Sequence, residues 1–462
     1  MSRKPNVLLF FTDDQRFDTI RALGNHEIHT PNLDALVARG TAFTRAHIPG
    51  GTSGAVCMPS RAMLHTGRTL FHLEQNGQEI PAVHTLLGEC FQSAGYATFG
   101  TGKWHNGKAA YARSFSDGDE IMFGGMGDHW NVLAHHFDPS GRYAGQCPLV
   151  EDPFHSNAVT WRHCDHVPGG RHSTDLFTEA ATAFLDRRDP EQPFFMYVSL
   201  MAPHDPRNMP PEYLALYDPD RLALPASFVP EHAIDTGALR IRDELLAAFP
   251  RDPAEIRRHI ADYYAMITHL DAAFGRLIEA LEAAGERDNT IIVFAGDNGL
   301  AVGRHGLMGK QCLYDHSVRV PLIVAGPGIP AGGRSDALVY LLDIFPTLCE
   351  LTGNAVPETV EGRSLVPCLT DPAYAPRNDL YLAYCDTIRG LTDGRYKWIE
   401  YASGARQLFD LESDPDEIRN LVDDPAARPV ADKLAARLRA CATEWDDRKH
   451  PHGAHFWDAV EG

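Results

Sequence analysis

Two short runs of apolar residues, each followed by oxygen-bearing side chains, constrain the fold of this chain most strongly. Residues 6–11 read NVLLFF and precede the pair Asp13 and Asp14, and residues 291–295 read IIVFA and precede an Asp-Asn pair. Continuous apolar runs of this length are typical of strands buried on both faces, as in α/β sheets covered by helices. The runs therefore predict an α/β fold in which polar groups gather at the strand ends.

The same strand ends predict a cation site. Two adjacent carboxylates at the end of a buried strand repel each other unless a positive charge lies between them, although a solvated turn is the common alternative for an Asp-Asp pair. Four oxygen donors without a Cys or His pair suit a hard divalent cation, Ca²⁺ before Mg²⁺ or Mn²⁺. We predict that its ligands are Asp13, Asp14, Asp297 and Asn298.

The segment CMPSR at residues 57–61 places a cysteine at a candidate anion-binding position. Cys57 follows a Gly-rich turn, and after Pro59 comes a run of helix formers closed by Gly67, so we predict that the cysteine lies at a helix N-terminus, where anions bind. The alternative is a buried structural cysteine.

Other predicted turns and strand ends carry Lys and His side chains. Lys103 and His105 lie in the segment GTGKWH after a predicted strand, His204 follows the apolar run 193–200, and Lys310 follows the second run described above. An ordinary surface turn and a structural histidine are the alternatives. A Lys and a His on one side of a Gly-rich turn can both point at an oxyanion, and ligands bind at the carboxyl ends of strands in open α/β sheets, so these positions favour a functional role.

These segments together resemble the motifs of the type I, formylglycine-dependent sulfatases of the alkaline-phosphatase-like superfamily. The match consists of C-x-P-S-R, three residues and then HTGR, with His65 where that family usually has Leu, followed by the G-x-G-K-W-H and A-P-H segments. The resemblance extends over essentially the whole chain and is weakest at 114–171 and 209–257.

The resemblance implies a mixed sheet sandwiched by helices, with a small C-terminal antiparallel sheet. We expect a catalytic domain at 1–370 and an antiparallel β subdomain with a terminal helix at 371–462. Within the first, apolar residues at helical spacing predict a long helix over 260–284. The irregular segment 114–171, rich in Gly, His and aromatics, is expected to help shape the substrate pocket.

The resemblance further implies a sulfuric ester hydrolase. Cys57 would be oxidised to Cα-formylglycine by a formylglycine-generating or anaerobic sulfatase-maturing enzyme, and a hydroxyl of the aldehyde hydrate would attack sulfur. His105 would take the proton that expels sulfate, and either His204 or Lys310 would protonate the leaving alcohol. The side chains that would neutralise charge on the sulfuryl group are Arg61, Lys103, His204 and Lys310.

Two other functions remain open at this point. A phosphonate monoester or phosphodiester hydrolase could use the same formylglycine site. A non-catalytic binder of sulfated glycans would have lost the nucleophile or a metal ligand, and none is missing. Aryl, choline and sugar sulfates all fit as substrates, and the segment rich in His and aromatics mildly favours a sulfated sugar.

Composition excludes several classes of protein. The net charge of −20 argues against nucleic acid and anionic membrane surfaces as partners, and no apolar run approaches the length of about 20 residues that a membrane span needs. We expect a soluble, cytoplasmic protein, or a periplasmic or secreted one if a signal peptide was removed. The nine cysteines form no framework and are expected to be reduced, and the His-Cys-Asp-His run at 163–166 does not fit a closed zinc site.

Overall fold

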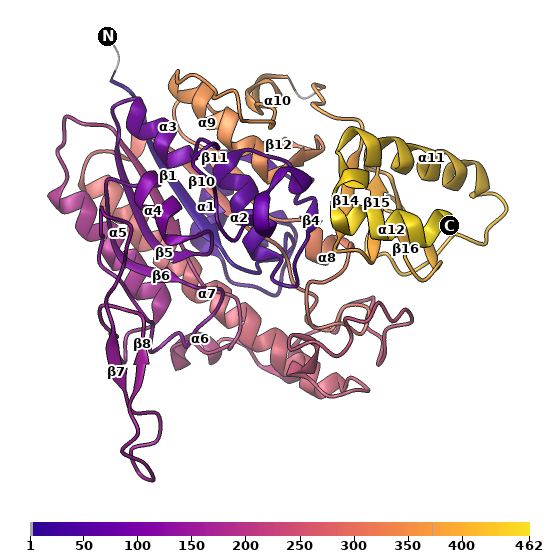
Figure 1. The fold of residues 1–462 in the computed structure, drawn as a ribbon, viewed down its shortest axis with the longest axis horizontal. Helices are drawn as coiled ribbons and strands as arrows, with labels where there is room; N and C mark the ends of the chain where they lie inside the picture. The colour runs from indigo at the N-terminus through magenta and orange to yellow at the C-terminus, as the bar shows by residue number, and fades with distance from the viewer. Residues whose placement is uncertain (1–2, 372) are drawn as a thin grey trace.

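The computed structural model describes residues 3–371 and 373–462, and its centre is an eight-stranded mixed sheet (Figure 1). Strands β10, β1, β9, β5 and β6 are parallel, whereas β11 is antiparallel to both of its neighbours. The two apolar runs form β1 and β10, which pair directly, with Thr12 opposite Gly296. In spatial order the strands are β12 (Gly333–Ser335), β2 (Gly40–Phe43), β11 (Leu322–Ala325), β10 (Thr290–Gly296), β1 (Asn6–Thr12), β9 (Phe194–Ser199), β5 (Ala97–Trp104) and β6 (Asp117–Phe123).

Helices cover both faces of this sheet. Alternate residues of a strand point to opposite faces, so Leu9 of β1 packs into one hydrophobic cluster and Leu8 into the other. The first cluster includes residues of α2 (Cys57–Thr66), α3 (Leu87–Ser93), α4 (Lys108–Ser114) and α9 (Ile344–Thr352). The second includes residues of α1 (Pro31–Arg39), α5 (Ser173–Arg187) and α7 (Pro253–Ala283). The predicted α/β fold with a sandwiched mixed sheet is confirmed.

Helix α7 is longer than the sequence pattern predicted. It begins at Pro253, seven residues before the predicted start, because the Asp252 side chain accepts a hydrogen bond from the Glu255 amide at 2.9 Å and caps the helix. Its apolar stripe is buried against the sheet, as expected.

A smaller sheet lies at the C-terminal end of the chain, drawn in yellow and orange in Figure 1. Its strands β14 (Leu380–Tyr384), β15 (Ile388–Thr392), β16 (Tyr396–Tyr401) and β17 (Arg406–Asp410) are antiparallel, as predicted, and α11 (Arg428–Glu444) and α12 (Pro451–Glu461) follow them. The short strand β4 (Gly50–Gly51) adds to β14 in parallel. The small sheet therefore contains residues from both sides of the boundary at 370, which stays a prediction.

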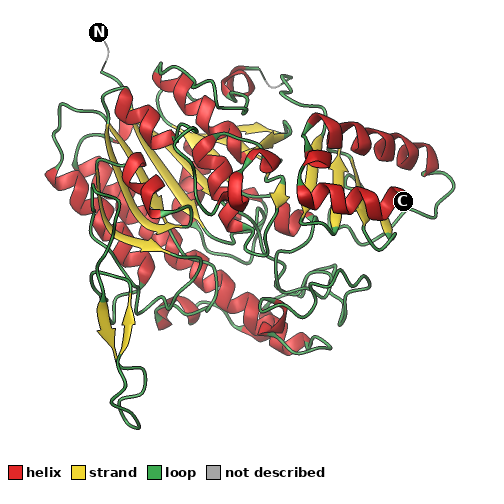
Figure 2. Cartoon of the chain, in the orientation of Figure 1, coloured by secondary structure: helices red, strands yellow, loops and turns green. Residues whose placement is uncertain are grey.

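The segments of weakest resemblance contain little regular structure. Between β6 and α5, a two-stranded hairpin of β7 (Cys147–Leu149) and β8 (Thr160–Arg162) projects from the body (Figures 1 and 2). The segment before α7 contains only short helices, including α6 (Pro211–Leu214). The other α-helices and β-strands of the described residues are β3 (Ala46–His47), β13 (Val339–Tyr340), α8 (Asp315–Val318) and α10 (Val366–Thr370), and short 3-10 helices lie in the connections.

Candidate active site

The ends of β1 and β10 bring four oxygen-bearing side chains together. Asp13 and Asp14 follow β1, and Asp297 and Asn298 follow β10, so parallel pairing places all four at one edge of the sheet. The Asp14 amide donates to Asp297 Oδ1 at 3.0 Å, and Asn298 Nδ2 donates to Asp14 Oδ1 at 2.7 Å. Asp14 has a φ of 61°, a left-handed conformation that is uncommon for a residue other than Gly and is often found at functional sites.

Three oxygens of this group accept no hydrogen bond within the described part of the chain. They are Asp13 Oδ1, Asp14 Oδ2 and Asn298 Oδ1, and all three residues are at most 1 % exposed. Buried oxygens without a donor are costly unless a cation satisfies them. An all-oxygen set of this kind fits a hard divalent ion.

Cys57 is the first residue of α2 and points at the same edge. Its Sγ lies 3.5 Å from Lys103 Nζ and 3.4 Å from His105 Nδ1. Burial raises the pKa of the Cys57 thiol, even though Lys103 and Lys310 favour the thiolate. The unmodified side chain is therefore a protonated thiol beside two cations.

Strand β5 delivers Lys103 into the site. The preceding Gly102 has a φ of 85°, and a Cβ added there would lie 1.9 Å from the Ser199 carbonyl oxygen, so only Gly fits. The β5–β6 register shifts between Thr101 and Gly102. Lys103 is fully buried and contacts Asp13 through its Nζ.

Lys310, His204 and Arg61 complete the cluster. Lys310 Nζ contacts Asp14, and His204 Nε2 lies 3.6 Å from the other oxygen of Asp14. Arg61 lies one helical turn after Cys57, where its Nε donates to Asp297 Oδ2 at 2.9 Å. Contacts among neighbouring members thus connect all ten residues singled out in the sequence.

The charges of the cluster balance before any ion is added. Asp13, Asp14 and Asp297 oppose Arg61, Lys103 and Lys310. Burial and the neighbouring Asp13 raise the pKa of Asp297 to about 7. Although burial alone would raise it, Lys103 and the other cations hold the pKa of Asp13 well below its usual value. A divalent ion would make the site positive, which suits an anionic substrate.

A pocket of about 260 Å³ opens on this cluster, and some members of the cluster line it. Cys57, His105, His204 and Lys310 line the pocket, whereas Lys103 and Arg61 lie behind it. The other lining residues are Gly54, Ala55, Gly125, Met126, Ile241, Arg242, Asp243 and Gln311. Gly125 and Met126 come from the irregular segment 114–171, so this segment contributes to the pocket as expected.

Two neighbours of the site were not anticipated from the sequence. Ser199 Oγ contacts Arg61 Nη1 at 2.5 Å, and the Arg242 guanidinium pairs with Asp205 at the pocket mouth. Ser199 is the last residue of the buried strand β9, and a polar residue at a strand end is a signal from which its place near the site could have been predicted. Arg242 lies in an irregular segment without a sequence signal.

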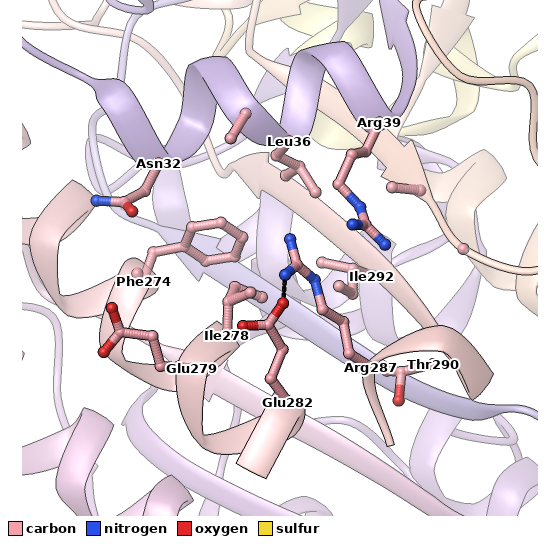
Figure 3. A pocket seen from close by; sticks show the side chains of 14 residues that line it. Asn32, Leu36, Arg39, Phe274, Ile278, Glu279, Glu282, Arg287, Thr290 and Ile292 are labelled. Carbon is pink, nitrogen blue, oxygen red and sulfur yellow. Dashed lines mark ion pairs between the residues drawn. The ribbon is translucent and has the colours of Figure 1, made fainter. Parts of the chain in front are cut away.

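A second pocket, of about 220 Å³, lies between α1 and the end of α7 (Figure 3). Its apolar lining includes Phe274 and Ile292. Two charged lining residues, Arg287 and Glu282, form an ion pair with each other. No Cys or His is among its lining residues. It lies at the start of β10, whereas the charged cluster follows the end of that strand, so the Cys57 pocket is the candidate active site.

The His-rich segment does not assemble a metal site within residues 3–371 and 373–462. His166 Nε2 pairs with Glu120 Oε2 at 2.9 Å, and the sulfur of Cys164 contacts the Arg162 carbonyl oxygen at 3.8 Å. Neither belongs to a group of possible metal ligands. Within the same ranges, no helix is long and apolar enough to cross a membrane.

Comparison with known proteins gives the family. The Sulfatase family model matches residues 5–354, and a model described as N-sulphoglucosamine sulphohydrolase, C-terminal, matches residues 303–444. An N-acetylglucosamine-6-O-sulfatase of Bacteroides thetaiotaomicron is 25 % identical over 91 % of this chain and 83 % of its own length.

Solved structures share the fold. A protein in complex with its substrate D-glucosamine-2-N,6-O-disulfate has a TM-score of 0.73 at 23 % identity, covering 97 % of this chain and 99 % of its own. The phosphonate monoester hydrolase of Agrobacterium radiobacter has a TM-score of 0.72 at 23 % identity, covering 96 % of each chain.

The match to the Sulfatase family model extends over most of the chain and includes both strand ends and Cys57. On this basis the chain belongs to the sulfatase family of the alkaline phosphatase superfamily and is a sulfuric ester hydrolase.

Proposed function

We propose that this enzyme hydrolyses a sulfate monoester of a sugar, or of a related small organosulfate, with Cys57 converted to formylglycine and one divalent cation bound at Asp13, Asp14, Asp297 and Asn298. The observation that carries the proposal is the set of three buried oxygens that accept no hydrogen bond within the described part of the chain, in the same cluster as Cys57, which lines a pocket together with His204 and Lys310.

The cation would be held by the four oxygen ligands, with Ca²⁺ preferred. Bound there, it would supply Lewis-acid polarisation of the sulfate oxygens and of the nucleophile. Lys103 and Lys310, whose ammonium groups contact Asp13 and Asp14, would hold these carboxylates in place and stabilise negative charge on the sulfuryl group.

Residue 57 is the proposed nucleophile. An unmodified thiol would remain protonated in this buried position, since burial raises its pKa. A formylglycine hydrate would present a hydroxyl instead, close to Lys103 and His105. The proposal therefore requires a maturing enzyme, of the formylglycine-generating or anaerobic type, as a partner of the newly made chain.

His105 is the proposed base. Burial lowers its pKa to about 2, with further lowering by Lys103 and Arg61, so the imidazole is neutral. Its Nδ1 faces residue 57 at 3.4 Å. Removal of a proton from the second hydroxyl would expel sulfate and regenerate the aldehyde.

Of the two candidate acids, we favour His204. Although burial alone would lower it, Asp14 and other neighbours hold the pKa of Lys310 well above its usual value, so Lys310 retains its proton and is better suited to stabilising charge. His204 lines the pocket, and its Nδ1 donates to the Asp205 carbonyl oxygen at 2.7 Å, which leaves Nε2, 3.6 Å from Asp14 Oδ2, as the nitrogen that would carry the transferred proton. Arg61, which lies behind the pocket, would orient Asp297.

A sulfated sugar is the proposed substrate class, as an anionic small molecule or a glycan terminus. Support comes from the relative named an N-acetylglucosamine-6-O-sulfatase and from the structure bound to a disulfated glucosamine. The pocket of about 260 Å³ would accommodate a single ring. Hydrolysis of a phosphonate monoester or phosphodiester is the alternative, since a hydrolase of that class shares the fold.

A matched substrate panel tests this proposal. Matured enzyme would be assayed on sulfated glucosamines, an aryl sulfate, a phosphonate monoester and a phosphodiester, with Cys57→Ala as control. The proposal predicts the highest kcat/KM on a sulfated sugar and loss of all activities in the variant. A higher kcat/KM on the phosphorus esters would favour the alternative, and a fully active Cys57→Ala would overturn both.

A further inference from the structure

A pair of thiols outside the active site lies in direct contact. Cys90 of α3 and Cys349 of α9 have their sulfur atoms 3.6 Å apart, although 259 positions separate them in the chain. Cys90 is 9 % exposed and Cys349 is fully buried. The chemistry proposed above uses neither residue.

This contact between two sulfur atoms differs from the surroundings of Cys57 and Cys312. Cys57 contacts Lys103 and His105, and Cys312 contacts His316 Nε2 at 3.3 Å. A disulfide bond is about 2.05 Å long, so the two sulfur atoms of Cys90 and Cys349 need to approach by roughly 1.5 Å. Rotation of the two cysteine side chains about their Cα–Cβ bonds can produce an approach of this size.

The pair joins two helices that both contact α2, the helix that begins at Cys57. A bond between them would connect the two ends of a long stretch of chain and fix the packing of the layer that supports the nucleophile. It would leave the pocket unchanged, because neither cysteine lines it.

The two thiols are not equivalent. Hydrogen bonding from Cys349 lowers the pKa of Cys90, whereas the same contact, together with burial, raises the pKa of Cys349. Cys90 is also the more exposed of the two. Cys90 is therefore the sulfur that ionises and meets an oxidant first.

We propose that Cys90 and Cys349 are a covalent modification site, at which a small hydroperoxide converts the two thiols to an intramolecular disulfide. The Cys90 thiolate attacks one peroxide oxygen, the O–O bond breaks, and Cys90 becomes a sulfenic acid while hydroxide leaves. The Cys349 sulfur then attacks the Cys90 sulfur, the S–S bond forms, and the sulfenic oxygen leaves as water. In total, two thiols and one hydrogen peroxide give one disulfide and two waters.

The bond is expected to stabilise the fold rather than to switch catalysis. It closes a loop of more than two hundred residues, so it restricts the unfolded chain strongly. For a chain of this length the apparent Tm should rise by on the order of 3–5 °C, and dithiothreitol should reverse the rise.

The test treats the matured full-length enzyme with equimolar hydrogen peroxide and maps its peptides without reduction. The expected product is a cross-linked peptide pair containing residues 90 and 349, lighter by two hydrogens than the separate peptides, with the Tm rise and unchanged kcat/KM. Cys349→Ala should lose the cross-link and the rise, whereas Cys368→Ala, which changes another buried cysteine, should keep both.

The peptide map decides the outcome even if a variant folds poorly, since it needs only the wild-type chain. Sulfinic or sulfonic acid at Cys90 without a cross-link would overturn the proposal. Recovery of both thiols unreacted, under conditions that oxidise a model dithiol peptide, would overturn it as well.

Discussion

Two buried clusters of charged side chains differ in what their oxygen atoms contact. At the ends of β1 and β10, carboxylates and cations balance, yet three oxygens receive no hydrogen bond in the described chain. Between the central sheet and the small C-terminal sheet, Lys397 contacts both Asp315 and Glu417, with 2.7 Å to Glu417. There Arg319 adds a second cation, 3.1 Å from Asp315.

The difference shows that burial of charge alone does not identify a functional site. The second cluster also shifts pKa values, since burial and the neighbouring Asp315 raise the pKa of Glu417 to about 7. Its members lie among no group of possible metal ligands in residues 3–371 and 373–462. Pockets also open beside Asp315 and Glu417, and within the described residues Glu417 Oε1 contacts only Lys397, at 2.7 Å. What distinguishes the first cluster is a set of three oxygens that accept no hydrogen bond in the described chain, in a cluster that includes Cys57.

The largest expected effect comes from changing a metal ligand. Asp297→Asn should lower kcat/KM by about a thousandfold or more, because the amide removes a negative charge from the cation site. Kinetics, metal analysis and circular dichroism would measure it. Asp315→Asn, the matched change in the second cluster, should reduce stability while the folded enzyme keeps its kcat. Equal activity losses in the two variants would break the distinction.

A second large effect concerns Lys397, whose removal leaves two carboxylates buried without their shared cation. Lys397→Met should cost about 3–5 kcal/mol in the free energy of unfolding, measured by urea denaturation. Activity at low temperature should stay within a few-fold of wild type. A variant as stable as wild type would show that this cluster does not support the fold.

Local sequence patterns predict some parts of the fold and of the candidate site, but not others. The apolar runs that precede Asp-Asp and Asp-Asn predict β1 and β10 because each signal lies in a few adjacent residues. The ligand cluster then requires only that the two strands pair in parallel, which they do. The two-residue strand β4 has no such signal, since its pairing with β14 depends on distant parts of the chain. Likewise, the N-cap of α12, which begins at Pro451, is His450, whose side chain accepts a hydrogen bond from the His452 amide. Histidine is not among the residue types from which a helix start is usually predicted.

A pH effect would sharpen the comparison further. The folded pKa of Glu417, about 7, exceeds its ordinary value of 4.5, so the folded state binds a proton more tightly than the unfolded state. The free energy of unfolding should therefore fall, by up to a few kcal/mol, as pH rises from about 4.5 to 7. Glu417→Gln should remove this decline in urea titrations at several pH values. Parallel curves for the two proteins would contradict the assignment.

The smallest predicted effect concerns His65, where the family usually has Leu. His65 is fully buried between Trp104 and Tyr197, neither ring nitrogen has a partner in the described chain, and burial with Arg61 nearby lowers its pKa to about 3. His65→Leu should raise the free energy of unfolding by about 1 kcal/mol and retain activity. His316→Leu, which loses a contact to Cys312, should destabilise instead.

The most direct test of the central claim is the mass of the peptide that contains residue 57, measured on enzyme preparations of different specific activity. The account predicts a peptide lighter than the cysteine form by the difference between a CH₂SH group and an aldehyde, in a fraction that rises in proportion to activity. Full activity in a preparation that contains only unmodified Cys57 would contradict it.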